Sequence, residues 1–367
     1  MKARRTALAL ALCLASPAHA WTGAGGEAPW RDTYVSAEIQ AICEAAVQVP
    51  LPPAPEPKAP PAPDCDVLDL YYGIGGPVDH AAARDCAHSH PEEGKGWEDA
   101  VLMMLYANGY AVERNLDAAT RLACEHGGAP MAIGLRVQYL QDIRALPPGG
   151  RLRQCAEGPH HHQYSEAYCR GAFDLCDDAT SGYMMGWCVA IASGKAAAAR
   201  DARLESLSED WPEAHKAALG ALKVAAWAYI EAHGGNEVDH SGTVRAAIQT
   251  GKEDEMRDAF VERLERLEDG WAPAFLDPGQ ALREADSDLN AAYRVVMGCD
   301  DFGPISGITA DGIRETQRLW IPYRDAWAAL AAARWPGAGA DAIRAHLIRE
   351  RTGILKGLQF DCRAFKR

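Results

Sequence analysis

Apolar residues recur every three or four positions along most of the chain beyond Asp64, in runs of about 10 to 20 residues separated by Gly or Pro. This spacing places the apolar side chains of each run on one face of a helix. No stretch shows the sustained alternation of apolar and polar residues that a strand requires. The pattern therefore predicts an all-α fold.

Residues 64–163 contain a repeated helix, glycine turn and helix. The motif Tyr-x-x-Gly-x-x-Val begins at Tyr72 and again 34 residues later at Tyr106. An Asp-x-Ala motif that leads to a cysteine begins at Asp79 and recurs 38 residues later at Asp117. A period in the mid-thirties predicts an array of helical hairpins in which each hairpin buries its apolar face against the next.

The stretch LMMLYANGYAVERNLDAATRLACE, residues 102–125, resembles the SEL-type branch of the tetratricopeptide-related repeats. Those helix pairs carry a Tyr, Gly and Val turn before an Ala-rich second helix. Proteins of that family use such repeats as binding scaffolds. The resemblance implies a protein-binding role for residues 64–163.

The first residues predict an export signal. Residues 1–20 combine a basic start, an apolar run and the ending Ala18-His19-Ala20, which is typical of a signal peptide cleaved before Trp21. A short segment at 21–49 and a linker at 50–63 with eight prolines follow. No later run is apolar and long enough to predict a transmembrane segment. We therefore expect a periplasmic or secreted protein.

The cysteines agree with export. Ten of the 11 lie beyond the leader, and an even number in an oxidising compartment predicts up to five disulfides. The ends of an antiparallel hairpin lie together, which favours a Cys65–Cys86 bridge and, for the following hairpin, a Cys124–Cys155 bridge. The N-terminal segment either docks on the rest of the protein through Cys43 or extends from it without docking. The remaining candidates are Cys176, Cys188, Cys299 and Cys362, with no Cys-x-x-Cys pair to suggest a metal or redox site.

The net charge restricts the partners. Without the leader the chain has 34 Lys and Arg against 51 Asp and Glu, a formal charge of −17. Nucleic acid does not suit this charge, whereas a cationic protein does.

Residues 313–326 (IRETQRLWIPYRDA) resemble the hallmark helix of the lysozyme inhibitor LprI-like domain, where a Gln-Arg-x-Trp-x-x-Tyr-Arg-Asp string is typical. The stretch 285–293 resembles the same family's Ala-x-x-x-Leu-Asn-x-x-Tyr helix, and 343–358 supplies its closing helix. The resemblance covers residues 278–367 and implies binding and inhibition of a lysozyme-type muramidase. Its binding candidates are Gln317, Arg318, Trp320, Tyr323, Arg324 and Asp325.

Helical spacing places Gln317, Trp320 and Arg324 on one stripe and Leu319, Tyr323 and Ala326 on the adjacent stripe, and we expect one of the two to face the core. In the alternative interpretation, Trp320 and Tyr323 are core aromatics, and Arg318 and Arg324 pair with acids such as Asp325. Pro322 lacks a backbone donor and predicts a kink in the helix.

Residues 164–270 resemble a degenerate second LprI-like unit. Cys176 and Cys188 match the family's opening, in which two nearby cysteines flank a short helix and join. At an offset of 94 residues, five positions of this region match the hallmark helix in kind: Leu219, Lys223, Tyr229, Glu231 and Ala232.

Other chemistry is weakly indicated. His160, His161 and His162 are adjacent, and consecutive histidines cannot all face one ion, so we interpret them as solvated rather than as a metal site. The chain has no hydrolase, phosphate-loop or dinucleotide motif, and we expect no cofactor. The hypothesis of a cell-wall hydrolase with a carboxylate pair stays open, because acid pairs are abundant.

The leading interpretation is an exported, disulfide-stapled, non-enzymatic protein. It joins helical hairpin repeats to antiparallel helical LprI-like units and binds a muramidase non-covalently. The alternative is a periplasmic scaffold or envelope-assembly factor that binds its partner through the SEL-like repeats.

Overall fold

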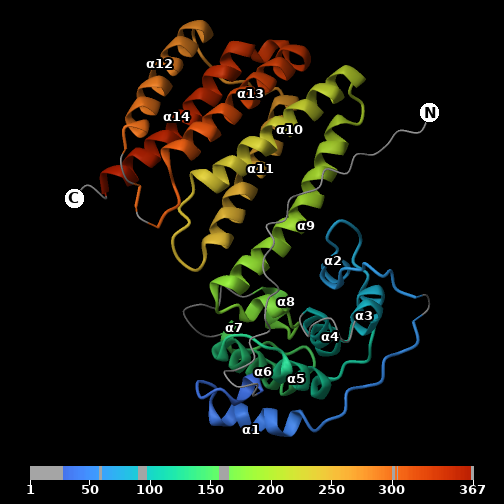
Figure 1. Cartoon of the computed structure of the whole chain (residues 1–367). Helices are drawn as coiled ribbons and strands as arrows, with labels where there is room; N and C mark the ends of the chain where they lie inside the picture. Colours follow the sequence, from blue (N-terminus) through green and yellow to red (C-terminus); the bar gives the residue numbers. More distant parts are fainter. Residues whose placement is uncertain are drawn as a thin grey trace. The chain divides into compact units, whose positions relative to one another are not determined.

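A computed structural model describes residues 28–57, 60–89, 97–156, 165–299, 302–303 and 305–364. These residues form helices and connecting loops without any β-strand, which confirms the all-α prediction (Figure 1). The expected signal peptide and the three adjacent histidines lie outside the described residues. None of the described helices is long and apolar enough to cross a lipid bilayer.

The chain divides into two compact units. The N-terminal unit comprises residues 1–71 and 79–178, and the C-terminal unit comprises residues 72–78 and 179–367. The helices of the N-terminal half, up to residue 178, are η1 (Pro29–Arg31), α1 (Ala37–Ala46), α2 (Val67–Tyr72), α3 (His80–Ser89), α4 (Trp97–Asn108), α5 (Leu116–Glu125), α6 (Pro130–Arg144), α7 (Arg153–Ala156), α8 (Glu166–Cys169) and η3 (Leu175–Asp178).

The helices α3 to α6 pack in succession, each against the next. Helix α4 is the centre of this unit, because every residue from Ala100 to Ala107 is buried. Helix α1 starts at Ser36, whose hydroxyl accepts a hydrogen bond from the Ile39 backbone N–H, and it packs on α5. The N-terminal segment is therefore part of this core.

The two glycine turns of the N-terminal half have the same backbone conformation. Gly73 and Gly109 both have φ of +72°, and Gly75 and Ala111 after them also have positive φ. In each turn, the N–H of the residue that caps the next helix donates to a carbonyl oxygen in the preceding helix: Asp79 to Leu70 and Asn115 to Tyr106. Equivalent positions of the two turns are therefore 36 residues apart, between the motif offsets of 34 and 38 and within the mid-thirties that the sequence indicated. A residue of positive φ directly after the last helical turn is typical of a helix C-terminus.

Disulfides cross-link the N-terminal unit. Cys65 and Cys86 are joined as predicted, with Cα atoms 6.1 Å apart. The predicted Cys124–Cys155 bridge is wrong, because Cys124 pairs with Cys43 and Cys155 pairs with Cys169. The physical reason is that α1 packs on α5 and brings Cys43 to Cys124, while α8 lies beside Cys155. Cys176, Cys188 and Cys299 are also disulfide-bonded, and the side chain of Cys362 lies outside the described part.

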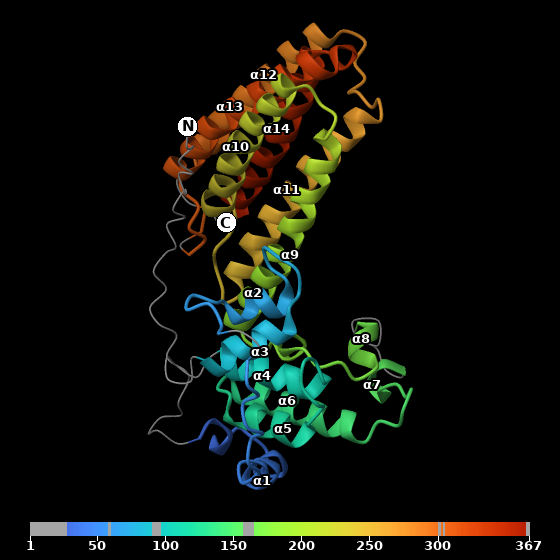
Figure 2. The ribbon, with the colours of Figure 1, turned by 90° about the vertical axis from the view of Figure 1, so that its right-hand side faces the viewer.

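The C-terminal unit is built from long helices. They are α9 (Gly182–Ser208), α10 (Glu213–Asn236), α11 (Arg245–Glu268), α12 (Pro278–Met297), α13 (Ala310–Arg334), the short η4 (Pro336–Ala338) and α14 (Ala340–Ala364). Helix α9 packs against α11, α10 against α13, and α12 against α14 (Figure 2). Side-chain oxygens of Ser181, Asp277 and Thr309 cap the N-termini of α9, α12 and α13.

Candidate functional site

The helix with the hallmark string is α13, and it continues through Pro322. Both predicted stripes contribute to the core, rather than one of them, because Trp320 of the first is 2% exposed and Tyr323 of the second is 8% exposed. Arg318, Ile321 and Asp325, which are three and four residues apart, form a separate exposed stripe. The two aromatic rings therefore belong to the core, as the alternative interpretation expected for them. The exposed stripe is left to meet solvent or a partner.

Arg324 connects the buried Trp320 to the exposed stripe. Its guanidinium lies 5.2 Å from the centre of the Trp320 ring and donates from Nε to the Asp325 carboxylate at 2.9 Å. The guanidinium is thus held flat on the helix surface. Arg318 is exposed beside it and has no ion pair with any residue that the structure describes.

Arg351 of α14 lies at the centre of a buried polar cluster. Its guanidinium donates to both carboxylate oxygens of Glu237 at 2.5 and 2.6 Å, and its Nε donates to the Gln317 side chain at 2.9 Å. His233 Nδ1 lies 2.9 Å from the same carboxylate. Arg351 and Glu237 are fully buried. This cluster joins the end of α10 to α13 and α14.

Burial raises the pKa of Glu237, but hydrogen bonds from Arg351 and His233 outweigh it, so the pKa of this carboxyl is lowered overall. Glu237 is therefore ionised at neutral pH although it is enclosed by protein. A buried carboxylate in this state depends on Arg351, because removal of that side chain leaves a buried charge without a compensating one.

A second cluster lies on α11 and α14. Arg263 Nη2 donates to both oxygens of Glu350 at 2.5 and 2.7 Å, and Arg263 Nη1 donates to the Tyr323 hydroxyl at 3.2 Å. The Arg263 side chain is 10% exposed, whereas that of Glu350 is 44% exposed. The cluster is therefore closed on the arginine side and open on the carboxylate side.

Helices α10 and α13 run antiparallel. Thr316 on α13 donates to the Ala232 carbonyl oxygen, and seven residues further along α13 Tyr323 stacks on Tyr229, which lies three residues earlier on α10. The ring centres of the two tyrosines are 5.1 Å apart. The two tyrosines have equivalent positions in the 94-residue offset, so α10 and α13 meet at a matching point.

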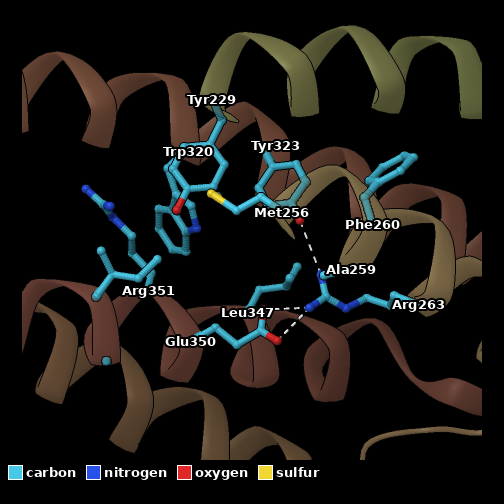
Figure 3. A pocket seen from close by; sticks show the side chains of 12 residues that line it. Tyr229, Met256, Ala259, Phe260, Arg263, Trp320, Tyr323, Leu347, Glu350 and Arg351 are labelled. Atoms are coloured by element: carbon cyan, nitrogen blue, oxygen red, sulfur yellow. Dashed lines mark hydrogen bonds and ion pairs between the residues drawn. The ribbon is translucent and has the colours of Figure 1, made fainter. Parts of the chain in front are cut away.

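A cavity of about 430 Å³ lies over this tyrosine pair, between α11 and α14. Figure 3 shows Met256 reaching over the tyrosines, with Arg263 between Tyr323 and Glu350. Apolar side chains form most of its wall, and the polar groups of the second cluster gather at one end. The arrangement suits binding and contains no nucleophile with an adjacent general base.

The helices α12, α13 and most of α14 correspond to a known family. Residues 278–355 match the family model described as Lysozyme inhibitor LprI. The match confirms the LprI-like prediction for the C-terminal part, and it names a family of inhibitors rather than catalysts. No curated protein and no solved structure matches the chain. The SEL-type assignment of the N-terminal half stays a prediction.

The structure thus divides the predicted binding residues of the LprI segment, residues 278–355, into two groups. Gln317, Trp320 and Tyr323 hold the helices together, and Arg318, Arg324 and Asp325 are the ones that reach the surface. The described residues contain no group of three His, Cys, Asp or Glu side chains that could hold a metal ion.

Sequence reasoning missed the two arginine clusters. One signal was present, because Arg351 interrupts an apolar stripe of Leu347 and Leu355 at helical spacing. A charged residue inside such a stripe must find a buried partner. The sequence offers no way to identify that partner, since Glu237 lies 114 residues away.

Proposed function

We propose that this chain is an exported, non-enzymatic protein that binds a lysozyme-type muramidase non-covalently and inhibits it. The match of residues 278–355 to Lysozyme inhibitor LprI carries the proposal. The disulfides of the N-terminal unit support export, because such bonds persist in oxidising compartments.

The exposed stripe of α13 is the proposed contact surface. Arg318, Arg324 and Asp325 present charged groups there, on a helix that the buried aromatics hold in place. Arg324 and Asp325 pair with each other, so the stripe combines an ordered ion pair with the exposed charge of Arg318. The role of Trp320 and Tyr323 in this proposal is to position the helix.

The test is a titration of lysozyme activity on cell walls with the oxidised mature protein. We expect stoichiometric loss of activity, relieved at least tenfold in the variant Arg318→Ala, Asp325→Ala. The matched control is Lys252→Ala, Glu255→Ala, which removes one base and one acid from an exposed pair on α11 outside the LprI segment. Lysozyme activity that is unchanged at every ratio would refute inhibition, and equal inhibition by both variants would refute the contact surface.

Charge predicts how this association responds to salt. A chain of net charge −17 attracts a cationic lysozyme over distances that salt screens. We expect the association rate constant to fall severalfold between low and physiological ionic strength, as measured by stopped-flow fluorescence. An association rate constant that does not change with salt would contradict electrostatic steering.

A scaffold that binds an envelope protein through the N-terminal hairpins is the second candidate. The successive packing of α3 to α6 and the repeated 36-residue turn favour it. A fragment of residues 28–178, which keeps the Cys43–Cys124 bridge, would retain the envelope partner in this case. Under the muramidase proposal the same fragment does not inhibit lysozyme.

A further inference from the structure

The cavity between α11 and α14 has no part in the proposed contact surface on α13. Its volume of about 430 Å³ lies within the range of about 300 to 1,000 Å³ that is typical of small-molecule sites. Met256, Phe260, Trp320 and Leu347 give it apolar and aromatic walls (Figure 3). Ile354 lines it as well. Such walls suit the body of a small apolar ligand.

The polar end of the cavity offers hydrogen-bond donors. Arg263 carries only donors, and the Tyr323 hydroxyl oxygen accepts from Arg263, which leaves the hydroxyl proton to donate. In the structure, the acceptor that faces Arg263 is the carboxylate of Glu350, held by two hydrogen bonds from the guanidinium. The polar end of the cavity therefore binds a carboxylate in this structure, that of Glu350.

Glu350 is the more exposed partner of this ion pair. Its side chain is 44% exposed, and His346 Nε2 lies 3.2 Å from its carboxylate as a second partner at the surface. Arg263 is almost fully buried and holds Tyr323. A ligand carboxylate that enters would exchange one ion pair for another of the same geometry.

We propose that this cavity binds a small amphipathic monocarboxylate, with its carboxylate on Arg263 and Tyr323 in place of Glu350 and its apolar body along Met256, Phe260 and Trp320. The aromatic wall includes Trp320, so occupancy changes the environment of an indole that fluorescence reports.

Three probes with one tail and different head groups test the proposal: octanoate, 1-octanol and octylamine. We expect octanoate to bind the full-length oxidised protein with one-to-one stoichiometry in calorimetry, at least tenfold more tightly than either of the others. Absence of octanoate binding, or equal affinity for octanoate and 1-octanol, would overturn the proposal.

Conservative variants test the two ends of the site. Tyr323→Phe removes one donor and should weaken octanoate binding severalfold, while 1-octanol is little affected. Glu350→Gln removes the competing charge and should tighten octanoate binding at least threefold. Unchanged octanoate affinity in both variants would overturn the assignment of the head group.

A larger side chain at the opening of the cavity tests where octanoate binds. Gly353 is exposed and lines the cavity, and a Cβ atom added there meets no other atom within 4 Å. Gly353→Leu should therefore weaken octanoate binding at least tenfold and leave the helix intact. The matched control is Gly357→Leu, one turn further along α14, where the added side chain is equally free but does not line the cavity. Equal octanoate affinity in the two variants would place the ligand elsewhere.

Discussion

Different interactions stabilise the inside of each of the two units. In the N-terminal unit, disulfides tie short helices at three described points: Cys43 to Cys124, Cys65 to Cys86 and Cys155 to Cys169. In the C-terminal unit, long helices surround an aromatic core, and buried arginines pair with carboxylates across it, as Arg200 does with Asp254 and Arg351 with Glu237.

The difference follows from helix length. Helices of 6 to 15 residues, such as α2 to α6, bury too little surface each to be stable alone, so cross-links that restrict the unfolded chain contribute strongly. Helices of 20 to 27 residues bury large rings such as Trp320 and Trp327. The stabilisation from this apolar burial offsets the free-energy cost of burying charges. Those charges fix which helices pair, since a mismatched pairing leaves one of them without a partner.

The largest effect on this comparison is expected from Arg351→Met. It leaves the Glu237 carboxylate buried without its main partner, and the free energy of unfolding of the C-terminal unit should fall by about 3–5 kcal/mol. Urea denaturation followed by tryptophan fluorescence measures it. The double variant Arg351→Met, Glu237→Gln should recover most of the loss. If it does not, the loss arises from packing rather than from the unpaired charge.

The next effect concerns the disulfides. Cys43→Ala, Cys124→Ala opens a loop of sequence separation 81 and should lower the free energy of unfolding of the N-terminal unit by about 2–4 kcal/mol. The Cys65→Ala, Cys86→Ala variant, with a separation of 21, should cost about 1 kcal/mol less because loop entropy grows with length. Circular dichroism during urea denaturation compares them. A larger loss from the shorter loop would contradict the entropic explanation.

The smallest effect is the pH dependence of Asp178. Burial raises the pKa of this carboxyl to about 7, against the opposing influence of Arg136. The folded protein therefore keeps a proton between pH 4 and 7 that the unfolded chain releases, so this group makes stability fall as pH rises through that window. Asp178→Asn should gain about 2 kcal/mol relative to the parent chain between pH 5 and pH 8, measured by urea denaturation at both. Parallel pH profiles of the two proteins would contradict the raised pKa.

The sequence correctly predicted features that depend on residues close together in the chain. Helical periodicity predicted the fold class, and the hairpin argument paired Cys65 with Cys86 correctly. It failed for Cys124, because its partner Cys43 lies on the far side of the proline tract and no local pattern reports that contact.

The candidate site shows the same limit. The hallmark string predicted the helix α13, but which of its side chains are buried depends on the packing of α10. The partners of Arg263 and Arg351 come from other helices. Only the positions of those helices show which residues of α13 are exposed charges and which are buried rings.

We propose on the same packing that residues 164–270 are the degenerate LprI-like copy expected from the sequence. The pairs α9 with α11 and α12 with α14 flank the antiparallel α10 and α13, and the equivalent Tyr229 and Tyr323 stack on each other. This is the arrangement that two identical chains related by a two-fold axis would have.

The Cys43–Cys124 bridge turns the chain between these residues into a covalent ring that includes the proline tract. A protease that cuts the exposed prolines opens the ring without releasing either piece. Under non-reducing conditions the nicked protein would migrate as one species, and fragments would separate only after reduction. Outside the cell, where proteases are common and reductants scarce, the N-terminal segment would stay attached through such damage.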